Sequence, residues 1–167
     1  MTPTALKSYF DYIIAHGVNP PSVRPSSPSS SPPSPLSPLT LLPPQPWFSI
    51  INLYGGPSSQ INTKDASFAA YSDRSALWVF QHYGFTGATS SPFPATIIFF
   101  INGLNDAITT AQPQTDFSAY LNYVDPTLTA TQAHAEYYGD VVYARLLALK
   151  KVVDPGLVFW NPQAVGA

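Results

Sequence analysis

Cysteine is absent from the 167 residues of this chain. The protein therefore has no disulfide, no thiolate ligand for a metal and no cysteine nucleophile. Histidine is also scarce, and the three histidines, at positions 16, 82 and 134, do not have the spacing typical of metal ligands. We therefore expect no metal site in this chain.

Charged residues are also few. Only 10% of the residues are charged, seven of them basic and nine acidic. No basic stripe is present, so nucleic acid is not an expected partner. The sequence contains no polybasic segment that would bind a membrane surface. It also contains no apolar run of about 18 residues, so a membrane is not an expected partner. The first residues form an amphipathic segment that carries Lys7 and Asp11, which is not the pattern of a signal peptide.

The well-known self-sufficient catalytic motifs are missing as well. The sequence contains no dinucleotide-binding glycine motif, no P-loop, no nucleophile elbow and no HExxH zinc motif. Its carboxylates are dispersed and form no evident acid/base pair. No single short motif therefore identifies the function of this chain.

Proline, by contrast, is abundant in one place. Nine of the 25 residues from 22 to 46 are proline and eight are serine. Such a segment has little to bury, so we expect it to be disordered or polyproline-like. It contains PxxP patterns at 32–35 and 35–38, the minimal ligand of an SH3-type partner, but without the usual flanking basic residue. Deletion of residues 23–45 would keep the reading frame and leave a short connection between the flanking elements. The tract is therefore either an unspliced intron or a genuine linker, and both interpretations are open.

Ordered elements are predicted on both sides of this tract. Apolar spacing predicts a short helix over residues 4–16. Aromatic and β-branched residues predict strands over 47–54, 75–85 and 118–125, and the segment 96–111 fits either a strand or a helix. With 167 residues, the chain has the length of one ordinary domain.

The clearest predicted element is a helix that begins after Asp140, a good N-cap residue. Its apolar positions predict that Leu146, Leu149 and Val153 pack against the strand at 118–125. Lys150 and Lys151 lie in the last turn, where the helix dipole favours cations. Three aromatic residues near this helix are expected in the core: Tyr138, Phe159 and Trp160.

Within the predicted strand at 118–125, alternation places Tyr120 and Asn122 on one face and Tyr123 on the other. One face would then offer a phenol and an amide together. The residues alone favour a purely structural strand over a functional one. Arg74, for its part, is expected in a structural ion pair.

The order of several motifs resembles the C-terminal part of the berberine bridge enzyme-like FAD-linked oxidoreductases, in the superfamily with a PCMH-type FAD domain. The resemblance is carried by "AYLNYVDP", "YYGDVVYARLLALKKVVDP" and "VFWNPQAV", and upstream by "WFSIINLYGGPSSQIN" and "YSDRSALWVFQHYG". It spans about residues 47–166 together with the helix at 4–16, and it is interrupted only at the proline-rich tract.

The resemblance implies a chemistry and a set of residues. In that family a substrate donates a hydride to flavin, commonly with O₂ as the final acceptor, and the cofactor carries the difficult step. Tyr120 matches the tyrosine that takes the substrate hydroxyl proton, and because a free phenol has a pKa of about 10, this role requires groups that stabilise the phenolate. Gln81 and Tyr123 match substrate-side positions, whereas Asn122 and Asn161 match positions near the flavin.

The resemblance also implies an α+β fold: a partial antiparallel substrate-domain sheet with covering helices and a C-terminal berberine-like segment. The expected divisions are a helix at 1–21, the insertion at 22–46, a substrate-domain remnant at 47–117 and the berberine-like segment at 118–167. The family's main FAD-binding domain has no counterpart in this chain.

Two functions remain open at this stage. The first is a fragment of an FAD-dependent oxidoreductase that acts on a small-molecule alcohol, carbohydrate or secondary metabolite and is inactive by itself. The second is a non-catalytic interaction protein that displays the proline-rich tract. The resembling family is often secreted, but the sequence predicts no location for this chain.

Overall fold

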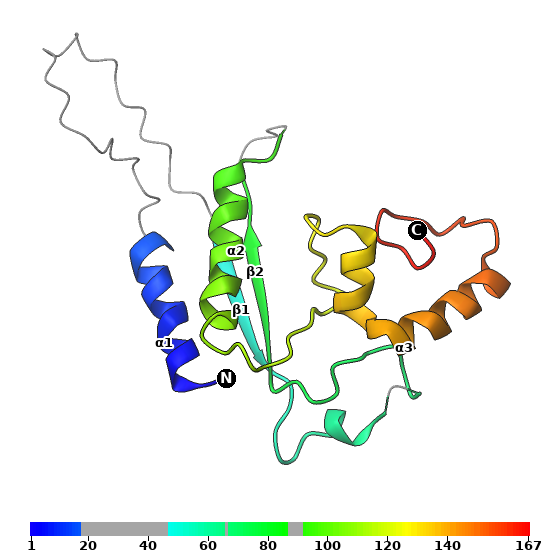
Figure 1. Cartoon of the computed structure of the whole chain (residues 1–167), viewed down its shortest axis with the longest axis horizontal. Coiled ribbons are helices and arrows are strands. Elements are labelled where there is room, and N and C mark those ends of the chain that lie inside the picture. Colours follow the sequence, from blue (N-terminus) through cyan, green and yellow to red (C-terminus); the bar gives the residue numbers. More distant parts are fainter. Residues whose placement is uncertain (18–46, 66, 87–91) are drawn as a thin grey trace, which may run out of the picture. The chain divides into compact units, whose positions relative to one another are not determined.

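The computed structural model describes residues 1–17, 47–65, 67–86 and 92–167 (Figure 1). The predicted insertion at 22–46 lies outside these residues. The chain forms two compact units, one of Met1–Ile50 with His82–Thr115 and one of Ile51–Gln81 with Asp116–Ala167. No helix in the described part of the chain is both long and apolar enough to cross a membrane.

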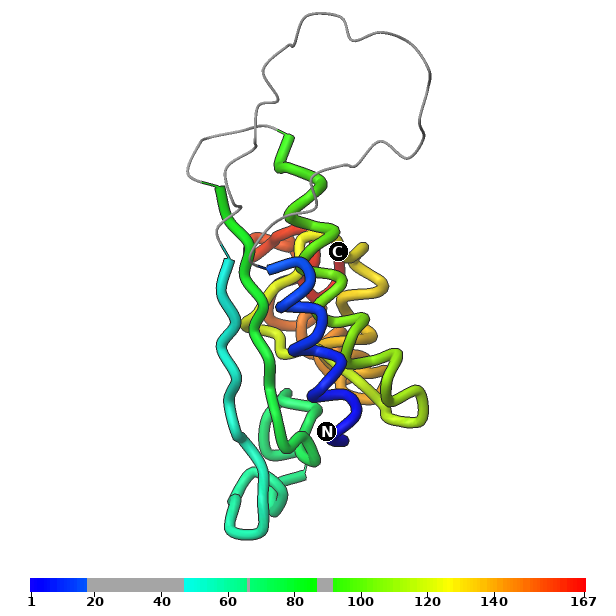
Figure 2. The backbone as a smooth tube through the Cα atoms, turned by 90° about the vertical axis from the view of Figure 1, so that its left-hand side faces the viewer, coloured from blue at the N-terminus to red at the C-terminus, as the bar shows by residue number. Residues whose placement is uncertain are grey.

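A two-stranded antiparallel sheet is built from β1 (Trp47–Leu53) and β2 (Trp78–Gly84), which run side by side (Figures 1 and 2). Each strand begins in one unit and ends in the other. Both strands lie within the ranges predicted from their aromatic and β-branched residues, and the expected α+β class is confirmed.

The first unit is organised by α1 (Pro3–Tyr12) and α2 (Ala95–Thr109). Thr2 caps α1 by accepting a hydrogen bond from the Ala5 amide at 3.2 Å, and a π-helical turn, Ile13–Gly17, follows. The predicted helix at 4–16 is thus confirmed, and the ambiguous segment 96–111 is a helix. The buried hydrophobic side chains of this unit come from both helices: Ala5, Tyr9, Ile97, Leu104 and Ile108.

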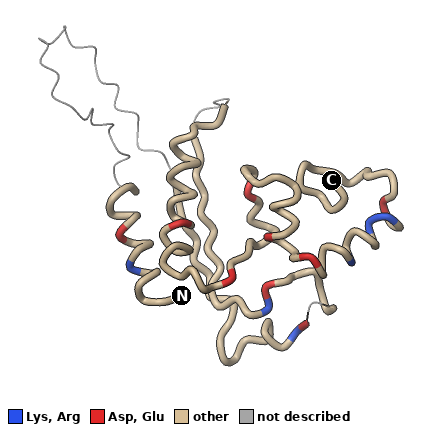
Figure 3. The backbone as a smooth tube through the Cα atoms, in the orientation of Figure 1, with Lys and Arg blue, Asp and Glu red and all other residues tan. Residues whose placement is uncertain are grey.

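α1 and α2 approach each other closely because glycine occupies position 103. A Cβ atom there would lie 2.1 Å from the Tyr12 hydroxyl. That hydroxyl donates to the Phe100 carbonyl at 3.3 Å, and the two rings stack with centroids 5.7 Å apart. α2 carries a single charged residue, Asp106, which suits a helix that is apolar around most of its circumference (Figure 3).

The second unit is organised around α3 (Ala130–Val153), whose start the sequence reading missed. Thr129 and Gln132 form a capping box at its N-terminus. At Gly139 the backbone leaves the helical region, with φ 63° and ψ 168°, and the helix then resumes. The predicted start at Asp140 is therefore the start of the second segment only, because a left-handed glycine interrupts a helix that was already under way.

The predicted strand at 118–125 is wrong. In this segment the Tyr123 amide donates to the Tyr120 carbonyl at 2.8 Å and closes a turn, while the Ala119 amide donates to the Glu136 carbonyl of α3 at 3.0 Å. The ring of Tyr120 packs here against those of Tyr54 and Tyr71, which both lie outside the strands. Since β propensity mainly reflects packing on a pleated surface, it fails where no neighbouring strand is present.

The core of this unit is a cluster on the first half of α3: Ala133, Tyr137, Tyr138 and Val142. Leu146 packs against it, but Leu149 and Val153 are 57% and 67% exposed, so their predicted burial is wrong. The physical reason is that the strand expected to cover them is a turn packed on the first half of the helix. Tyr138 is in the core as expected, whereas Phe159 and Trp160 are 80% and 60% exposed.

The C-terminal tail is tied to the unit by polar contacts. The Asp154 carboxylate accepts hydrogen bonds from Lys150 and from the amides of Val158 and Phe159, the last two at 2.8 and 3.1 Å. The Lys150 ammonium and these amides hold the pKa of Asp154 below its usual range. Further along, the Gln163 side chain donates to the carbonyls of Asp125 and Leu128 at 2.7 and 2.9 Å. These contacts fix the loop that follows Tyr120–Tyr123.

Gly55, at the end of β1, permits the sharp exit of that strand. A Cβ atom at this position would lie 2.6 Å from the Ala76 carbonyl oxygen and 3.1 Å from the Leu77 Cα atom. Both are backbone atoms that cannot rotate away, so Gly55→Ala is expected to cost about 1–3 kcal/mol in the free energy of unfolding. This loss corresponds to roughly 2–4 °C in Tm per kcal/mol, measurable by thermal denaturation.

The matched control is Gly156→Ala, because the nearest atom to a Cβ there is the Val158 Cγ2 at 3.9 Å. That variant is expected to unfold within about 0.5 kcal/mol of the parent. Equal stability of the two variants would show that the close approach at Gly55 is not a constraint on the fold.

Candidate active site

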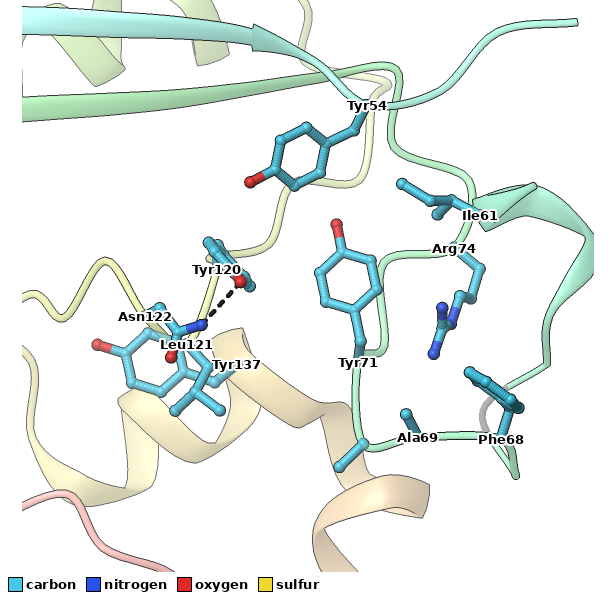
Figure 4. Close-up of a pocket in the computed structure, with 11 residues that line it drawn as sticks. Tyr54, Ile61, Phe68, Ala69, Tyr71, Arg74, Tyr120, Leu121, Asn122 and Tyr137 are labelled. Atoms are coloured by element: carbon cyan, nitrogen blue, oxygen red, sulfur yellow. Dashed lines mark hydrogen bonds between the residues drawn. The ribbon is translucent and has the colours of Figure 1, made fainter. Parts of the chain in front are cut away.

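A cavity of about 450 Å³ lies in the second unit, and its walls are mainly aromatic and apolar (Figure 4). Its volume falls within the usual range of small-molecule sites. Three tyrosines, one arginine and one asparagine supply its most prominent polar groups. These are Tyr54, Tyr71, Tyr120, Arg74 and Asn122.

Tyr120 and Asn122 lie together in the wall of this cavity because the turn at 120–123 brings their side chains round to each other. The Asn122 amide nitrogen donates to the Tyr120 hydroxyl oxygen at 2.7 Å. An amide donor at that oxygen leaves the hydroxyl hydrogen free to face another acceptor. The pair therefore presents a phenol and an amide side by side in the cavity wall.

Three other tyrosine rings position Tyr120. The rings of Tyr54, Tyr71 and Tyr123 meet it edge to face, with centroids 6.1, 5.7 and 5.1 Å away. Edge-to-face contacts of this kind are each worth about 0.5–1.5 kcal/mol. The Tyr120 hydroxyl is thus placed by packing from three directions and by one hydrogen bond.

The two neighbouring phenols of the cavity are held in their neutral form. Burial raises the pKa of Tyr71, and the nearby Asp73 carboxylate raises it further. Burial also raises the pKa of Tyr54, together with the hydrogen bond and charge of Tyr123. At neutral pH both phenols are therefore hydrogen-bond donors.

Arg74 does not form the predicted ion pair. In the described part of the chain the ion pairs are Lys7–Asp11 and Lys150–Asp154. The Arg74 guanidinium instead lies over the Tyr71 ring, 5.1 Å from its centroid. The carboxylate of the neighbouring Asp73 accepts a hydrogen bond from the Ser118 hydroxyl instead.

The other residues predicted from the sequence lie outside this cavity. Tyr123 packs behind Tyr120, and its hydroxyl accepts from the Asn52 amide at 3.4 Å. It does not lie on an opposite strand face, because the segment is a turn. Gln81 is half-buried on β2 and is not part of the cavity wall, and Asn161 lines a separate cavity of about 300 Å³ near the C-terminal tail.

The sequence reading missed Tyr54, Tyr71 and Arg74 as residues of this cavity. Tyr54 directly precedes the Gly55–Gly56 turn, a position where an aromatic side chain at a strand end could have drawn attention. Tyr71 and Arg74 lie in irregular backbone between the 3₁₀ turn Ile61–Thr63 and β2, where no periodic pattern applies. Only the fold brings them to Tyr120.

Comparison with known proteins places this arrangement in a family. The family model described as "Berberine and berberine like" matches residues 119–166, which contain Tyr120, Asn122 and the whole of α3. Residues 119–166 of this chain are a berberine-like segment. The resemblance inferred from its sequence motifs is confirmed.

Curated relatives of this berberine-like chain are oxidases and oxidoreductases. It is 35% identical to the carbohydrate oxidase of Microdochium nivale over 119 residues, and 31% identical to the xylooligosaccharide oxidase of Thermothelomyces thermophilus over 122 residues. An FAD-linked oxidoreductase of Penicillium rubens is 30% identical over 111 residues. The first two matches each cover 71% of this chain and 24% of the relative, so the chain spans about a quarter of these relatives' length.

Solved structures agree with this assignment. The crystal structure of the Microdochium nivale carbohydrate oxidase, in complex with a substrate analogue, matches 98% of the berberine-like chain with a TM-score of 0.70 and 29% identity. The xylooligosaccharide oxidase of Myceliophthora thermophila, in complex with xylobiose, matches with the same TM-score and 26% identity. The match covers 30% of each of those chains.

Proposed function

We propose that this chain is the substrate-side part of an FAD-dependent oxidoreductase that oxidises a hydroxyl group of a carbohydrate, with O₂ as the electron acceptor. The single observation that supports it is the Tyr120 hydroxyl, held by the Asn122 amide in the wall of a cavity of about 450 Å³. The similarity to carbohydrate, xylooligosaccharide and chitooligosaccharide oxidases supports the class of substrate.

Tyr120 is the proposed base. Oxidation of an alcohol to a carbonyl removes the hydroxyl proton, which the Tyr120 oxygen would accept, and a hydride from carbon, which bound FAD would accept. The Asn122 N–H group donates to the Tyr120 oxygen and orients it for this role. Two further residues are proposed to face the substrate, Gln81 and Tyr123. Two others are proposed to lie near the flavin, Asn122 and Asn161.

The aromatic walls of the cavity suit a carbohydrate, whose C–H faces pack on rings while its hydroxyls need donors and acceptors at the edges. The neutral phenols of Tyr54 and Tyr71 supply donors, and the Asn122 side chain also has a carbonyl oxygen that can accept. The substrate would thus be oriented by phenols and one amide.

The cavity does not fit FAD as a whole. Among the described residues no glycine lines it, whereas a pyrophosphate requires close approach of several backbone N–H groups. The described residues of the cavity therefore suit a substrate and not the cofactor.

Flavin binding and turnover test this proposal. The chain mixed with FAD and then desalted is expected to retain no stoichiometric flavin absorbance. A chimera in which its matching 119 residues replace their counterpart in the Microdochium nivale carbohydrate oxidase is expected to bind flavin, oxidise an oligosaccharide and consume O₂.

Stoichiometric flavin on the chain alone would show that it holds the cofactor unaided. A folded, flavin-loaded chimera that oxidises no carbohydrate would refute the proposed substrate class. Oxidation with a dye acceptor but without O₂ uptake would refute only the assignment of O₂.

A further inference from the structure

Two polar groups in the cavity wall have no hydrogen-bond partner within the described part of the chain. The Nε and Nη2 atoms of Arg74 are buried and form no hydrogen bond there. The Tyr71 hydroxyl is also buried and likewise forms none. Both residues line the cavity, and Figure 4 shows them side by side, with the guanidinium close to the Tyr71 ring.

Such an arrangement is unusual because an unsatisfied buried donor is costly, and a charged one most of all. The cation–π contact with the Tyr71 ring offsets only part of the cost of the hydrogen bonds that the guanidinium lacks. Asp73 is the acidic residue beside Arg74 in the chain, but its carboxylate is held by the Ser118 hydroxyl and is not part of the cavity wall. The Nε and Nη2 atoms of Arg74 thus have no hydrogen-bond acceptor among the described residues, although Arg74 lines the cavity.

We propose that Arg74 binds the carboxylate of an acidic sugar unit in this cavity, with the Tyr71 hydroxyl as a second donor. That the ligand is a sugar rests on the function proposed above. A guanidinium is planar and matches a carboxylate with two parallel N–H···O bonds, so the Nε and Nη2 edge fits this group closely.

The charge balance of the cavity favours a carboxylate over a phosphate. Of the residues that the structure describes in its wall, Arg74 is the only basic one and none is acidic. A carboxylate carries one negative charge, which one guanidinium neutralises. A phosphate ester close to two negative charges would leave an uncompensated charge among aromatic side chains.

A carboxylate can come from two kinds of sugar. One is a uronic acid unit of an oligosaccharide, in which the carboxylate is a substituent of a closed ring. The other is an aldonate, the open-chain acid formed when an oxidised reducing end takes up water. In either case the rings of Tyr54, Tyr71 and Tyr120 would face the sugar while Arg74 holds the acid group.

Binding measured on the purified chain tests this inference without any flavin. Calorimetry or NMR titration would compare glucuronate, gluconate, glucose and acetate at the same ionic strength. Glucuronate or gluconate is expected to bind about 10- to 100-fold more tightly than glucose, the range for a charged hydrogen-bonded pair. Whichever acid binds more tightly identifies the source of the carboxylate.

Arg74→Gln is expected to abolish the preference for the acid over glucose, whereas Arg74→Lys keeps the charge and should retain only part of it. The matched control is Lys64→Gln, which removes a cation that lies over the Phe68 ring, 4.9 Å from its centroid, but does not line the cavity. This control should leave the preference unchanged. An NMR spectrum of each variant confirms that it is folded.

The possible outcomes separate this inference from the proposed function. Equal affinity for acids and glucose, or a preference that survives in folded Arg74→Gln, overturns the carboxylate site but leaves a carbohydrate site standing. Binding of acetate through Arg74, with neither sugar acid binding more tightly than acetate, overturns the sugar ligand and speaks against the proposed carbohydrate function. Tighter binding of a sugar acid than of both acetate and glucose, lost in Arg74→Gln, supports the inference.

Discussion

Replacement of Tyr120 by phenylalanine in a flavin-loaded chimera is expected to lower kcat by about 10²–10⁴-fold, the usual cost of losing a general base. The ring and its edge-to-face contacts with Tyr54, Tyr71 and Tyr123 remain in this variant. Only the hydroxyl that accepts from Asn122 is lost. Substrate affinity should therefore change much less than turnover, and steady-state kinetics give both quantities.

Tyr143→Phe provides a matched control, because it removes a hydroxyl from a tyrosine of α3 that does not line the cavity. That hydroxyl accepts a hydrogen bond of 3.4 Å from the Gly166 amide, so its loss should alter kcat by less than tenfold. If Tyr120→Phe raises KM while kcat stays near the parent value, Tyr120 only positions the substrate. Equal losses in both variants would contradict the assignment of Tyr120 as the base.

Acidification is expected to destabilise the first unit through His82. Burial lowers the pKa of this histidine from 6.5 to about 4. The unfolded chain therefore binds the proton first, so stability falls as pH drops below 6.5 and levels off below about 4. The difference of about 2.5 pKa units corresponds to about 3 kcal/mol in the free energy of unfolding.

The surroundings of His82 explain why the neutral ring is favoured. Its Nδ1 atom lies 2.8 Å from the Ser49 hydroxyl, and the ring stacks on Tyr9 with centroids 5.6 Å apart. Tyr9 is itself buried, and burial raises the pKa of its phenol, so it stays uncharged as well. A proton on His82 would therefore enter a site without a compensating negative charge in either neighbour.

Urea denaturation at pH 7 and pH 4.5, followed by NMR signals of the first unit, measures this effect. His82→Gln should lose the part of the pH dependence that comes from the imidazole, while acid groups elsewhere still titrate in both proteins. A direct titration of the His82 ring protons should give a midpoint of about 4. A midpoint near 6.5, or identical pH dependence in the variant, would show that burial does not control this residue.

The sequence predicted regular elements correctly where the expected helix or strand also has neighbouring elements to pack against. The helix α1 and the strands β1 and β2 follow from apolar periodicity and from runs of aromatic and β-branched residues. The start of α3 was also readable, since Thr129 and Gln132 form a capping box that the sequence reading overlooked. The same composition misled at 118–125, where no strand is present to pair with.

The sequence by itself determined the family, the chemistry expected of Tyr120 and Asn122, and most of the regular elements, because motif order and periodicity are properties of neighbouring residues. Only the tertiary structure decided that Tyr120 and Asn122 meet through a turn, and that Tyr54, Tyr71 and Arg74 join Tyr120 around one cavity. It also decided that Arg74 faces that cavity without an ion pair. These residues lie between 46 and 66 positions from Tyr120 in the sequence. Their contacts depend on how the loops of the second unit pack, and no local pattern encodes that packing.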